Sequence, residues 1–275
     1  MDQVCAQPKI LGILNVTPDS FSDGGQFAEA KRAIEHFDIL LKDGADFVDV
    51  GAESTRPGAS DVDEREEWHR LAPVLEHAKA TGKIDRVSVD TRKFGIMKNA
   101  VRMGVGMINN VGAIPEAHQL RELSSQKPKL SFIACHMHGS PESMQNHPIG
   151  PASALKRVRA YFESSREDLL SSGFDSNEIY FDPGIGFGKT DAANLALLAE
   201  TRQLAKNFNI AVGISRKGFI SRLLGPVSLG ERDAASKALE ACSILQGAKI
   251  VRTHNVKELK PFLNTWAHFR AEVRA

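Results

Sequence analysis

Short runs of β-branched and aromatic residues alternate with segments of helical spacing along the whole chain. Strands joined by intervening helices form a parallel sheet, and eight such units favour a closed (β/α)8 TIM barrel over an open doubly wound sheet. Its length of 275 residues is ordinary for one barrel, so we predict a single α/β domain spanning residues 1–275. The predicted strands are Ile10–Leu14, Phe47–Val50, Arg86–Val89, Gly106–Ile108, Leu130–Ala134, Ile179–Phe181, Ile210–Ile214 and Lys249–Val251.

The predicted helices carry recognisable start and stop signals. Ser228 and Glu231 have the spacing of a capping box and predict the start of a helix. Pro73 lies within an apolar stripe of helical spacing, so we expect it to kink or split that helix. The last predicted helix carries Trp266 and Phe269 on its apolar stripe.

Composition excludes several classes of protein. The formal net charge is +1, so the overall balance favours neither nucleic acid nor an anionic membrane as a partner. The three cysteines are far apart and show neither metal-ligand spacing nor a disulfide framework, which suits a reducing compartment. No apolar run is long enough to span a membrane and no signal peptide is evident, so we expect a cytoplasmic protein.

Polar residues and glycines follow each predicted strand. In a barrel of this kind the carboxyl ends of the strands meet at one mouth, where the active site lies. The sequence therefore predicts a site assembled from eight separate places. These segments are Asn15–Gly25, Gly51–Gly58, Asp90–Lys93, Asn109–Asn110, His136–Gly139, Asp182, Ser215–Gly218 and Arg252–His254.

The segment Ile179–Thr190 combines an acid at a strand end with an open backbone loop. Asp182 ends the strand, and three alternating glycines follow before Lys189. The loop resembles two phosphate-binding motifs but fits neither: a Walker loop needs glycine where Pro183 stands, and a dinucleotide fingerprint needs glycine at position 189. Its chemistry therefore depends on Asp182 and on the side chains that meet it.

Two carboxylates and an amide predict the recognition of a planar polar ligand. Asp90 and Asp182 end apolar strands, and a carboxylate can accept two parallel bonds from adjacent N–H donors on a ring edge. Asn109 can donate and accept beside them. An alternative for Asp90 is a helix N-cap, since Thr91 could begin a helix.

Cations from separate loops predict an anionic substrate. Phosphate or carboxylate would suit such a convergent set best. An ordinary charged rim is the alternative, with most weight for Lys189. The cations are Arg56, Lys189, Lys217, Arg252 and His254.

The only metal predicted is Mg²⁺, on the amide oxygen of Asn15 together with substrate phosphates. His136 and His138 alternate along a strand end, so they would point to opposite sides and make a poor metal pair. We expect at least one of them to be a packed core histidine. The long loops after the first two strands, with Phe21 in one of them, could be lids that exclude water or ordinary surface connections.

Five motifs in order along nearly the whole chain resemble the signatures of bacterial dihydropteroate synthases. Several such motifs together are far more specific than any one. They are Ile13–Gly25 (ILNVTPDSFSDGG), Glu53–Gly58 (ESTRPG), Ser88–Thr91 (SVDT), Asp182–Lys189 (DPGIGFGK) and Ser215–Lys217 (SRK).

The resemblance implies a folate-pathway transferase. It would condense 6-hydroxymethyl-7,8-dihydropterin diphosphate with 4-aminobenzoate, giving 7,8-dihydropteroate and pyrophosphate, with Mg²⁺ on Asn15 and a homodimer formed through outer helices that include Trp266 and Phe269. Asp90, Asp182, Lys217, Arg252 and His254 would be catalytic. The implied pterin contacts are Asp90, Asn109, Met137, Asp182, Gly213 and Lys217; the diphosphate contacts are Asn15, Thr55, Arg56, Arg252 and His254; the aminobenzoate contacts are Phe21, Pro57, Phe187, Lys217 and Gly218.

Three segments depart from the family pattern. Asn110 stands where an aspartate is usual, and the ending of the last strand has Thr253 and Asn255 where a valine and an aspartate are usual. Gly218 replaces a serine whose hydroxyl would bind the aminobenzoate carboxylate, so backbone N–H groups at the start of the next helix would have to do more.

Other functions fit parts of the same pattern. A pterin-dependent methyltransferase of the same barrel family would use the acids but not the diphosphate cations. An aldolase-like barrel would use Lys217 as a Schiff base. A non-catalytic pterin-binding paralogue would be supported only by the substitutions at Asn110 and Gly218.

Overall fold

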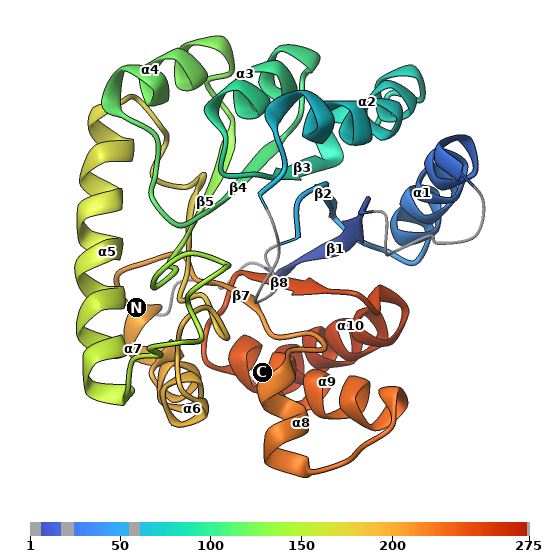
Figure 1. Cartoon of the computed structure of the whole chain (residues 1–275). Helices are drawn as coiled ribbons and strands as arrows, with labels where there is room; N and C mark the ends of the chain where they lie inside the picture. Colours follow the sequence, from blue (N-terminus) through green and yellow to red (C-terminus); the bar gives the residue numbers. More distant parts are fainter. Residues whose placement is uncertain (1–6, 18–24, 55–60, 274–275) are drawn as a thin grey trace.

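Eight parallel strands form the barrel that the alternation predicts (Figure 1). The computed structural model describes residues 7–17, 25–54 and 61–273. The sheet order is β6-β5-β4-β3-β2-β1-β8-β7, so the neighbours follow the order of the chain. The strands are β1 (Lys9–Asn15), β2 (Phe47–Gly51), β3 (Val87–Asp90), β4 (Met107–Val111), β5 (Ser131–Cys135), β6 (Ile179–Asp182), β7 (Ala211–Gly213) and β8 (Ile250–Thr253).

The barrel is nearly closed between β6 and β7. An isolated parallel bridge joins Phe181 to Ile210, and the N–H of Phe181 donates to the carbonyl of Asn209 over 2.8 Å. This bridge brings the end of β6 beside the start of β7. Asp182 and the Ser215–Gly218 segment therefore lie on adjacent parts of the rim.

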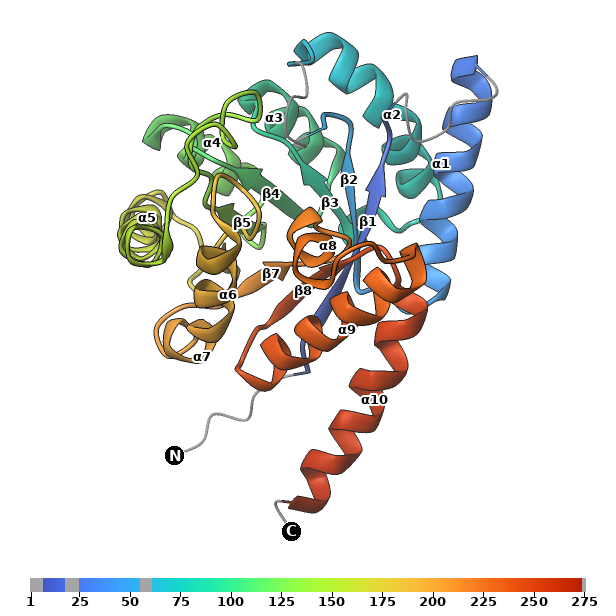
Figure 2. The ribbon, with the colours of Figure 1, turned by 60° about the horizontal axis from the view of Figure 1, so that its bottom comes forward.

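Helices cover the outside of the strands, as the two views of the ribbon show (Figures 1 and 2). The expectation of one helix per strand holds for β1 to β5 and for β8, whereas two helices follow β6 and two follow β7. The helices are α1 (Gly25–Lys42), α2 (Glu64–Ala80), α3 (Phe94–Met103), α4 (Ala117–Gln126), α5 (Pro151–Ser171), α6 (Asp191–Ala199), α7 (Thr201–Leu204), α8 (Gly218–Leu224), α9 (Leu229–Leu245) and α10 (Val256–Val273), with the 3-10 turn η2 (Ile84–Arg86) before β3.

Local signals in the helices have mixed outcomes. The capping box is confirmed: the Ser228 hydroxyl accepts from the N–H of Glu231, and the Glu231 carboxylate accepts from the N–H of Ser228. Of the two outcomes expected at Pro73, a kink or a split, the split is wrong, because α2 runs through Pro73 without interruption. Within the described ranges, no helix is long and apolar enough to cross a membrane.

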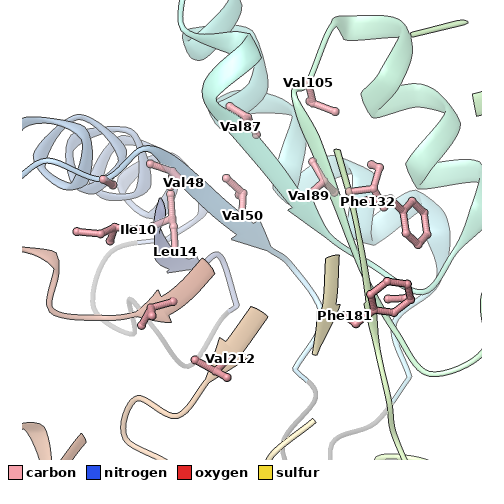
Figure 3. Packing of buried hydrophobic residues seen from close by; sticks show 14 of the residues in the cluster. Ile10, Leu14, Val48, Val50, Val87, Val89, Val105, Phe132, Phe181 and Val212 are labelled. Carbon is pink, nitrogen blue, oxygen red and sulfur yellow. The ribbon is translucent and has the colours of Figure 1, made fainter. Parts of the chain in front are cut away.

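Alternation along the strands separates two apolar layers. Outward-facing side chains such as Val48, Val50 and Val89 pack under the helices in the main core (Figure 3). A second, smaller cluster that includes Leu11 and Ile133 fills the barrel interior. Because Val48 and Val50 point outward, the residue between them must point inward, and that residue is Asp49.

A candidate active site at the carboxyl ends of the strands

A buried ion-pair cluster occupies the mouth of the barrel on the side of β2, β3 and β8. The guanidinium of Arg252 donates to Asp49 through Nε over 2.8 Å and also through Nη2, and Nη2 donates to Asp90 over 2.7 Å. Asp49 and Arg252 are buried, and Asp90 is largely so. One arginine thus neutralises part of the charge of two carboxylates from neighbouring strands.

Two neutral side chains complete the hydrogen bonds of Asp49. Ser88 donates to one carboxylate oxygen over 2.6 Å, and the Asn109 amide donates to the other over 3.0 Å. The amide oxygen of Asn109 is buried and has no partner in the described residues. An unsatisfied buried acceptor at a barrel mouth is ready to accept a bond from a ligand N–H.

Asp90 and Asp182 have raised pKa values. Burial raises the pKa of Asp90 to about 7, against the attraction of Arg252. Burial also raises the pKa of Asp182, opposed by Lys217 and by the bond from the N–H of Gly184. Burial alone would lower the pKa of Arg252, but Asp49 and Asp90 raise it above its ordinary value, so it stays charged.

Asp182 faces the ion-pair cluster across Gly213. Its carboxylate accepts from the N–H of Gly184 over 2.7 Å. A Cβ placed on Gly213 would lie 3.6 Å from the Asp182 carboxylate and 3.5 Å from the Arg252 guanidinium. The acid and the arginine therefore approach the same point beside Gly213, and no side chain at position 213 separates them.

Lys217 and Phe187 form an aromatic and cationic wall beside Asp182. The ammonium of Lys217 lies 4.2 Å from the centre of the Phe187 ring and donates to the carbonyl of Ile185. Burial lowers the pKa of Lys217, although Asp182 acts in the opposite direction. Met137 packs against the small cluster that contains Phe187. The four predicted residues on this side of the mouth, Asp182, Lys217, Phe187 and Met137, therefore lie close together.

The Ser-Arg-Lys segment after β7 sends its three side chains in three directions. Ser215 contacts the ring of His254, with 3.0 Å between Oγ and Nδ1. Arg216 has a φ of 59°, the only positive value outside glycine among the described residues, and its guanidinium pairs with Asp233 on α9 at 2.8 Å. Lys217 alone turns into the mouth.

Lys189 does not line the mouth, contrary to the prediction that it joins the convergent cations. Its side chain is 2% exposed, and its ammonium donates to the carbonyls of Gly184 at 2.8 Å, Phe187 at 3.0 Å and His136 at 3.4 Å. Phe187 is also largely buried. The sequence could not show this, because a lysine after a glycine loop fits an inward or an outward position equally well.

The alternative role of Asp90 as a helix cap is wrong, because α3 begins at Phe94 and Lys93 occupies its N-cap position. The prediction of one core histidine is confirmed: His136 is buried, and burial lowers its pKa to about 3. Trp266, an expected dimer contact, is half-buried and packs against the core. Several predicted residues lie outside the described residues, namely Phe21, Thr55, Arg56, Pro57 and the side chain of Phe269.

Asp49 is the main functional residue that the sequence analysis missed. It lies in the middle of the predicted strand Phe47–Val50, whereas the barrel pattern predicts site residues only after the strands. An acid inside an apolar strand was the available signal, since a buried charge needs a partner. The partner is Arg252, 203 residues later in the chain.

The described residues fit a metal carried by the substrate better than a metal held by the protein alone. They contain no group of three His, Cys, Asp or Glu side chains that could hold an ion. Asn15 ends β1 and is half-buried beside Gly51. One amide oxygen at this edge suits Mg²⁺ that takes its other ligands from phosphates and water.

The fold and the mouth define a (β/α)8 barrel whose strand ends place carboxylate and amide acceptors beside a buried arginine. A model of the pterin binding enzyme family matches residues 11–254. A dihydropteroate synthase of Neisseria meningitidis serogroup C is 37% identical over 264 residues, covering 94% of this chain and 92% of that protein. The chain belongs to the dihydropteroate synthases, which are transferases of the pterin-binding family.

Solved structures agree with this assignment. Xanthomonas albilineans dihydropteroate synthase with 4-aminobenzoic acid superposes with a TM-score of 0.87 at 34% identity, covering 97% of this chain and 94% of that one. The Anaplasma phagocytophilum enzyme with bound 6-hydroxymethylpterin-monophosphate gives a TM-score of 0.83 at 35% identity, covering 96% of this chain and 99% of that one.

Proposed function

We propose that the mouth joins 6-hydroxymethyl-7,8-dihydropterin diphosphate to 4-aminobenzoate, with the side chains described above in specific roles. The observation that carries the assignment is that the buried carboxylate of Asp182 and the guanidinium of Arg252 approach the same point beside Gly213 from two different strands. This arrangement offers an acceptor for ring N–H groups within a few ångströms of a donor for an anion. A pterin diphosphate carries both groups on one molecule.

In this proposal, Asp182 accepts hydrogen bonds from the edge of the pterin ring. The 2-amino group and the adjacent ring N–H of the pterin are two parallel donors, which suit one carboxylate. The unpartnered amide oxygen of Asn109 is a further acceptor for the ring. Lys217 and Met137 close the slot around it.

Arg252 and His254 hold the leaving diphosphate. Arg252 is already oriented by Asp49 and Asp90, so little side-chain freedom is lost when the anion binds. Ser215 orients the ring of His254. Asn15 would hold Mg²⁺, which would neutralise charge on the diphosphate, and Thr55 and Arg56 would join from the segment after β2.

The reaction is proposed to be dissociative. The bond between the pterin methylene carbon and the diphosphate oxygen breaks, and its electron pair leaves with pyrophosphate. The resulting cation is delocalised into the ring, and the carboxylate of Asp90 stabilises it from nearby. The neutral amine of 4-aminobenzoate then attacks the methylene carbon and loses a proton to solvent or pyrophosphate.

No protein nucleophile is required. Phe187 and Lys217 supply the wall against which the aminobenzoate ring lies, with Pro57 and Phe21 as further contacts. The rate comes from positioning two substrates and from charges arranged before they bind.

A coupled pyrophosphate assay tests this function. Purified protein should release pyrophosphate when the pterin diphosphate, 4-aminobenzoate and Mg²⁺ are present, and release should fall sharply when any one is omitted. Dihydropteroate should form in equal amount. Methyl transfer from a methylated pterin to a corrinoid protein, without pyrophosphate release, would favour the methyltransferase alternative.

We also propose a homodimer that works in the cytoplasm. Large apolar side chains are exposed where α8 ends and α9 begins, including Leu223, Leu224 and Leu229. Such residues on outer helices support contact with a second copy. Light scattering of the purified protein at micromolar concentration measures the mass directly.

A further inference from the structure

A buried lysine at the end of the glycine loop has no role in the reaction as proposed. Lys189 follows Gly188, is 2% exposed and donates to backbone carbonyls instead of lining the mouth. A lysine is almost never this buried without partners that make use of its three N–H donors. Its environment therefore needs an explanation.

The ammonium of Lys189 bonds three carbonyls from two segments. Gly184 and Phe187 belong to the glycine loop, and their carbonyls accept over 2.8 and 3.0 Å. His136 belongs to the segment after β5, and its carbonyl lies 3.4 Å away. One cation thus ties both ends of the Gly184–Phe187 turn to the neighbouring strand end.

Each tied residue connects directly to the pterin side of the mouth. The N–H of Gly184 donates to the Asp182 carboxylate over 2.7 Å, so the residue whose carbonyl Lys189 holds also orients Asp182 through its N–H. Phe187 carries the ring that Lys217 covers. His136 donates through its own N–H to the carbonyl of Asp182 over 3.0 Å.

The backbone is shaped to admit this contact. Gly184 has a φ of 65°, and a Cβ there would lie 1.8 Å from the carbonyl oxygen of His136 and 3.3 Å from the ammonium of Lys189. Gly188 has a φ of 64°, and a Cβ there would lie 2.2 Å from the carbonyl oxygen of His138. Both glycines let the loop lie directly on the segment after β5.

We infer that Lys189 is a positioning residue for the pterin: its ammonium fixes the glycine loop so that Asp182 and Phe187 are held in their binding geometry before the substrate arrives. The inference rests on the proposed role of Asp182 in holding the pterin ring. It assigns a function to the lysine of the glycine loop that requires no contact with either substrate.

The hydrogen bonds from Lys189 to the glycine loop should also depend on pH. Burial lowers the pKa of Lys189 to about 7, with the thiol of Cys135 and the carboxylate of Asp182 opposing and Lys217 assisting. His136 and His138 lie on the segment against which the loop packs, and the pKa of each is lowered, chiefly by burial. Above neutral pH the amine has two N–H donors for three carbonyls, so the loop is held less firmly.

The test compares Lys189→Met with Lys127→Met. Lys127 also donates to a backbone carbonyl, that of Gly104, over 2.7 Å, but it lies beyond the end of α4 and outside the mouth. Calorimetric titration with the pterin diphosphate, in the absence of 4-aminobenzoate, should show affinity weakened about 30-fold in Lys189→Met. The Lys127→Met control should stay within about twofold of the unsubstituted protein.

Three further measurements separate positioning from mere stability. The thermal midpoint of Lys189→Met should stay within about 4 °C, because removal of a desolvated charge offsets the lost hydrogen bonds. Hydrogen exchange at the Gly184 amide should accelerate about tenfold or more. The decline in pterin affinity between pH 6 and pH 8.5 should be steeper in the unsubstituted protein than in Lys189→Met.

The outcomes are distinct. Unsubstituted protein that fails to bind the pterin diphosphate overturns the proposed function itself. Normal binding by both the unsubstituted protein and a folded Lys189→Met overturns only the positioning role. If Lys189→Met does not fold, Lys189→Gln carries the same test, and a loss of affinity that appears only in parallel with unfolding would show a purely structural lysine.

Discussion

Asp90 and Asp182, two of the carboxylates of the mouth, are held in opposite ways. Asp90 shares the guanidinium of Arg252 with Asp49, so three strands contribute to one ion-pair cluster. Asp182 accepts a backbone N–H from Gly184, and the nearby Lys217 donates to a carbonyl instead. Charge is largely balanced on one side before any ligand binds, whereas the carboxylate on the other side still lacks donors.

This difference separates stability from recognition. A charge that is already paired is costly to unpair, so substitutions in the Arg252 cluster should weaken folding as well as catalysis. A buried acid with few donors is tolerated because a ligand supplies them, so substitution of Asp182 should act mainly on binding.

Asp182→Asn should have the largest functional effect. The amide presents an N–H group to the ring donors, and kcat/KM should fall about 1000-fold. Stability should not fall, because burial raises the pKa of Asp182 and the substitution removes that unfavourable charge. Steady-state kinetics and thermal melts measure the two effects. Asp168→Asn, on the exposed face of α5, is the matched control. Full turnover in Asp182→Asn would contradict the assigned role.

Arg252→Met should have the largest effect on stability. It leaves Asp49 and Asp90 facing each other without a cation, which costs about 3–5 kcal/mol. Urea unfolding monitored by circular dichroism measures it. The double variant Asp49→Asn with Arg252→Met should recover part of the loss. A single variant as stable as the unsubstituted protein would show that solvent reaches this cluster and that the contrast with Asp182 is false.

The pH profile should distinguish Asp90 from Asp182. Burial raises the pKa of Asp90 to about 7, so Asp90 is fully ionised only above neutral pH. Turnover should therefore rise about tenfold as pH increases through 7. Stability should change in the other direction. A folded pKa above the unfolded value of 3.8 means that the native state binds more protons between about pH 4 and 7, and stability falls as pH rises across that window.

Asp90→Asn is the variant that isolates this titration. It should flatten the step in turnover near pH 7 and leave the remainder of the profile in place. A step of the same size in Asp90→Asn would assign the titration to another group.

The fold was predictable because the signal was periodic and repeated eight times. Strand ends identified Asp90, Asn109, Asp182 and Arg252, since parallel strands bring their carboxyl ends to one edge. What sequence position could not supply was direction. Asp49 faces inward from mid-strand, and Lys189 is buried against backbone carbonyls, because packing and partner geometry decide where a side chain points.

Two of the departures from the family pattern, Thr253 and Asn110, have structural contacts, whereas Gly218 lies near the proposed site. Thr253 turns outward, where its hydroxyl accepts from Lys237 of α9 over 2.6 Å. Asn110 is buried, and its amide donates to the carbonyl of Ala113 over 3.1 Å. Both are structural substitutions outside the two carboxylate clusters.

Gly218→Ser should have the smallest effect and a confined one. Gly218 follows Lys217 at the start of α8, and a Cβ there would lie 3.3 Å from Nη1 of Arg222. Arg222 pairs with Asp191 and its side chain is more than half exposed, so it can shift to admit the new side chain. The new hydroxyl lies beside the proposed aminobenzoate wall and beyond the reach of either carboxylate cluster.

The KM for 4-aminobenzoate should therefore fall two- to threefold, roughly what one solvent-accessible hydrogen bond contributes, while the KM for the pterin diphosphate stays constant. Steady-state kinetics with each substrate varied in turn measure the two KM values separately. A change in the pterin KM alone would mean that the second substrate does not lie along Phe187 and Lys217, and unchanged values for both would remove Gly218 from the site.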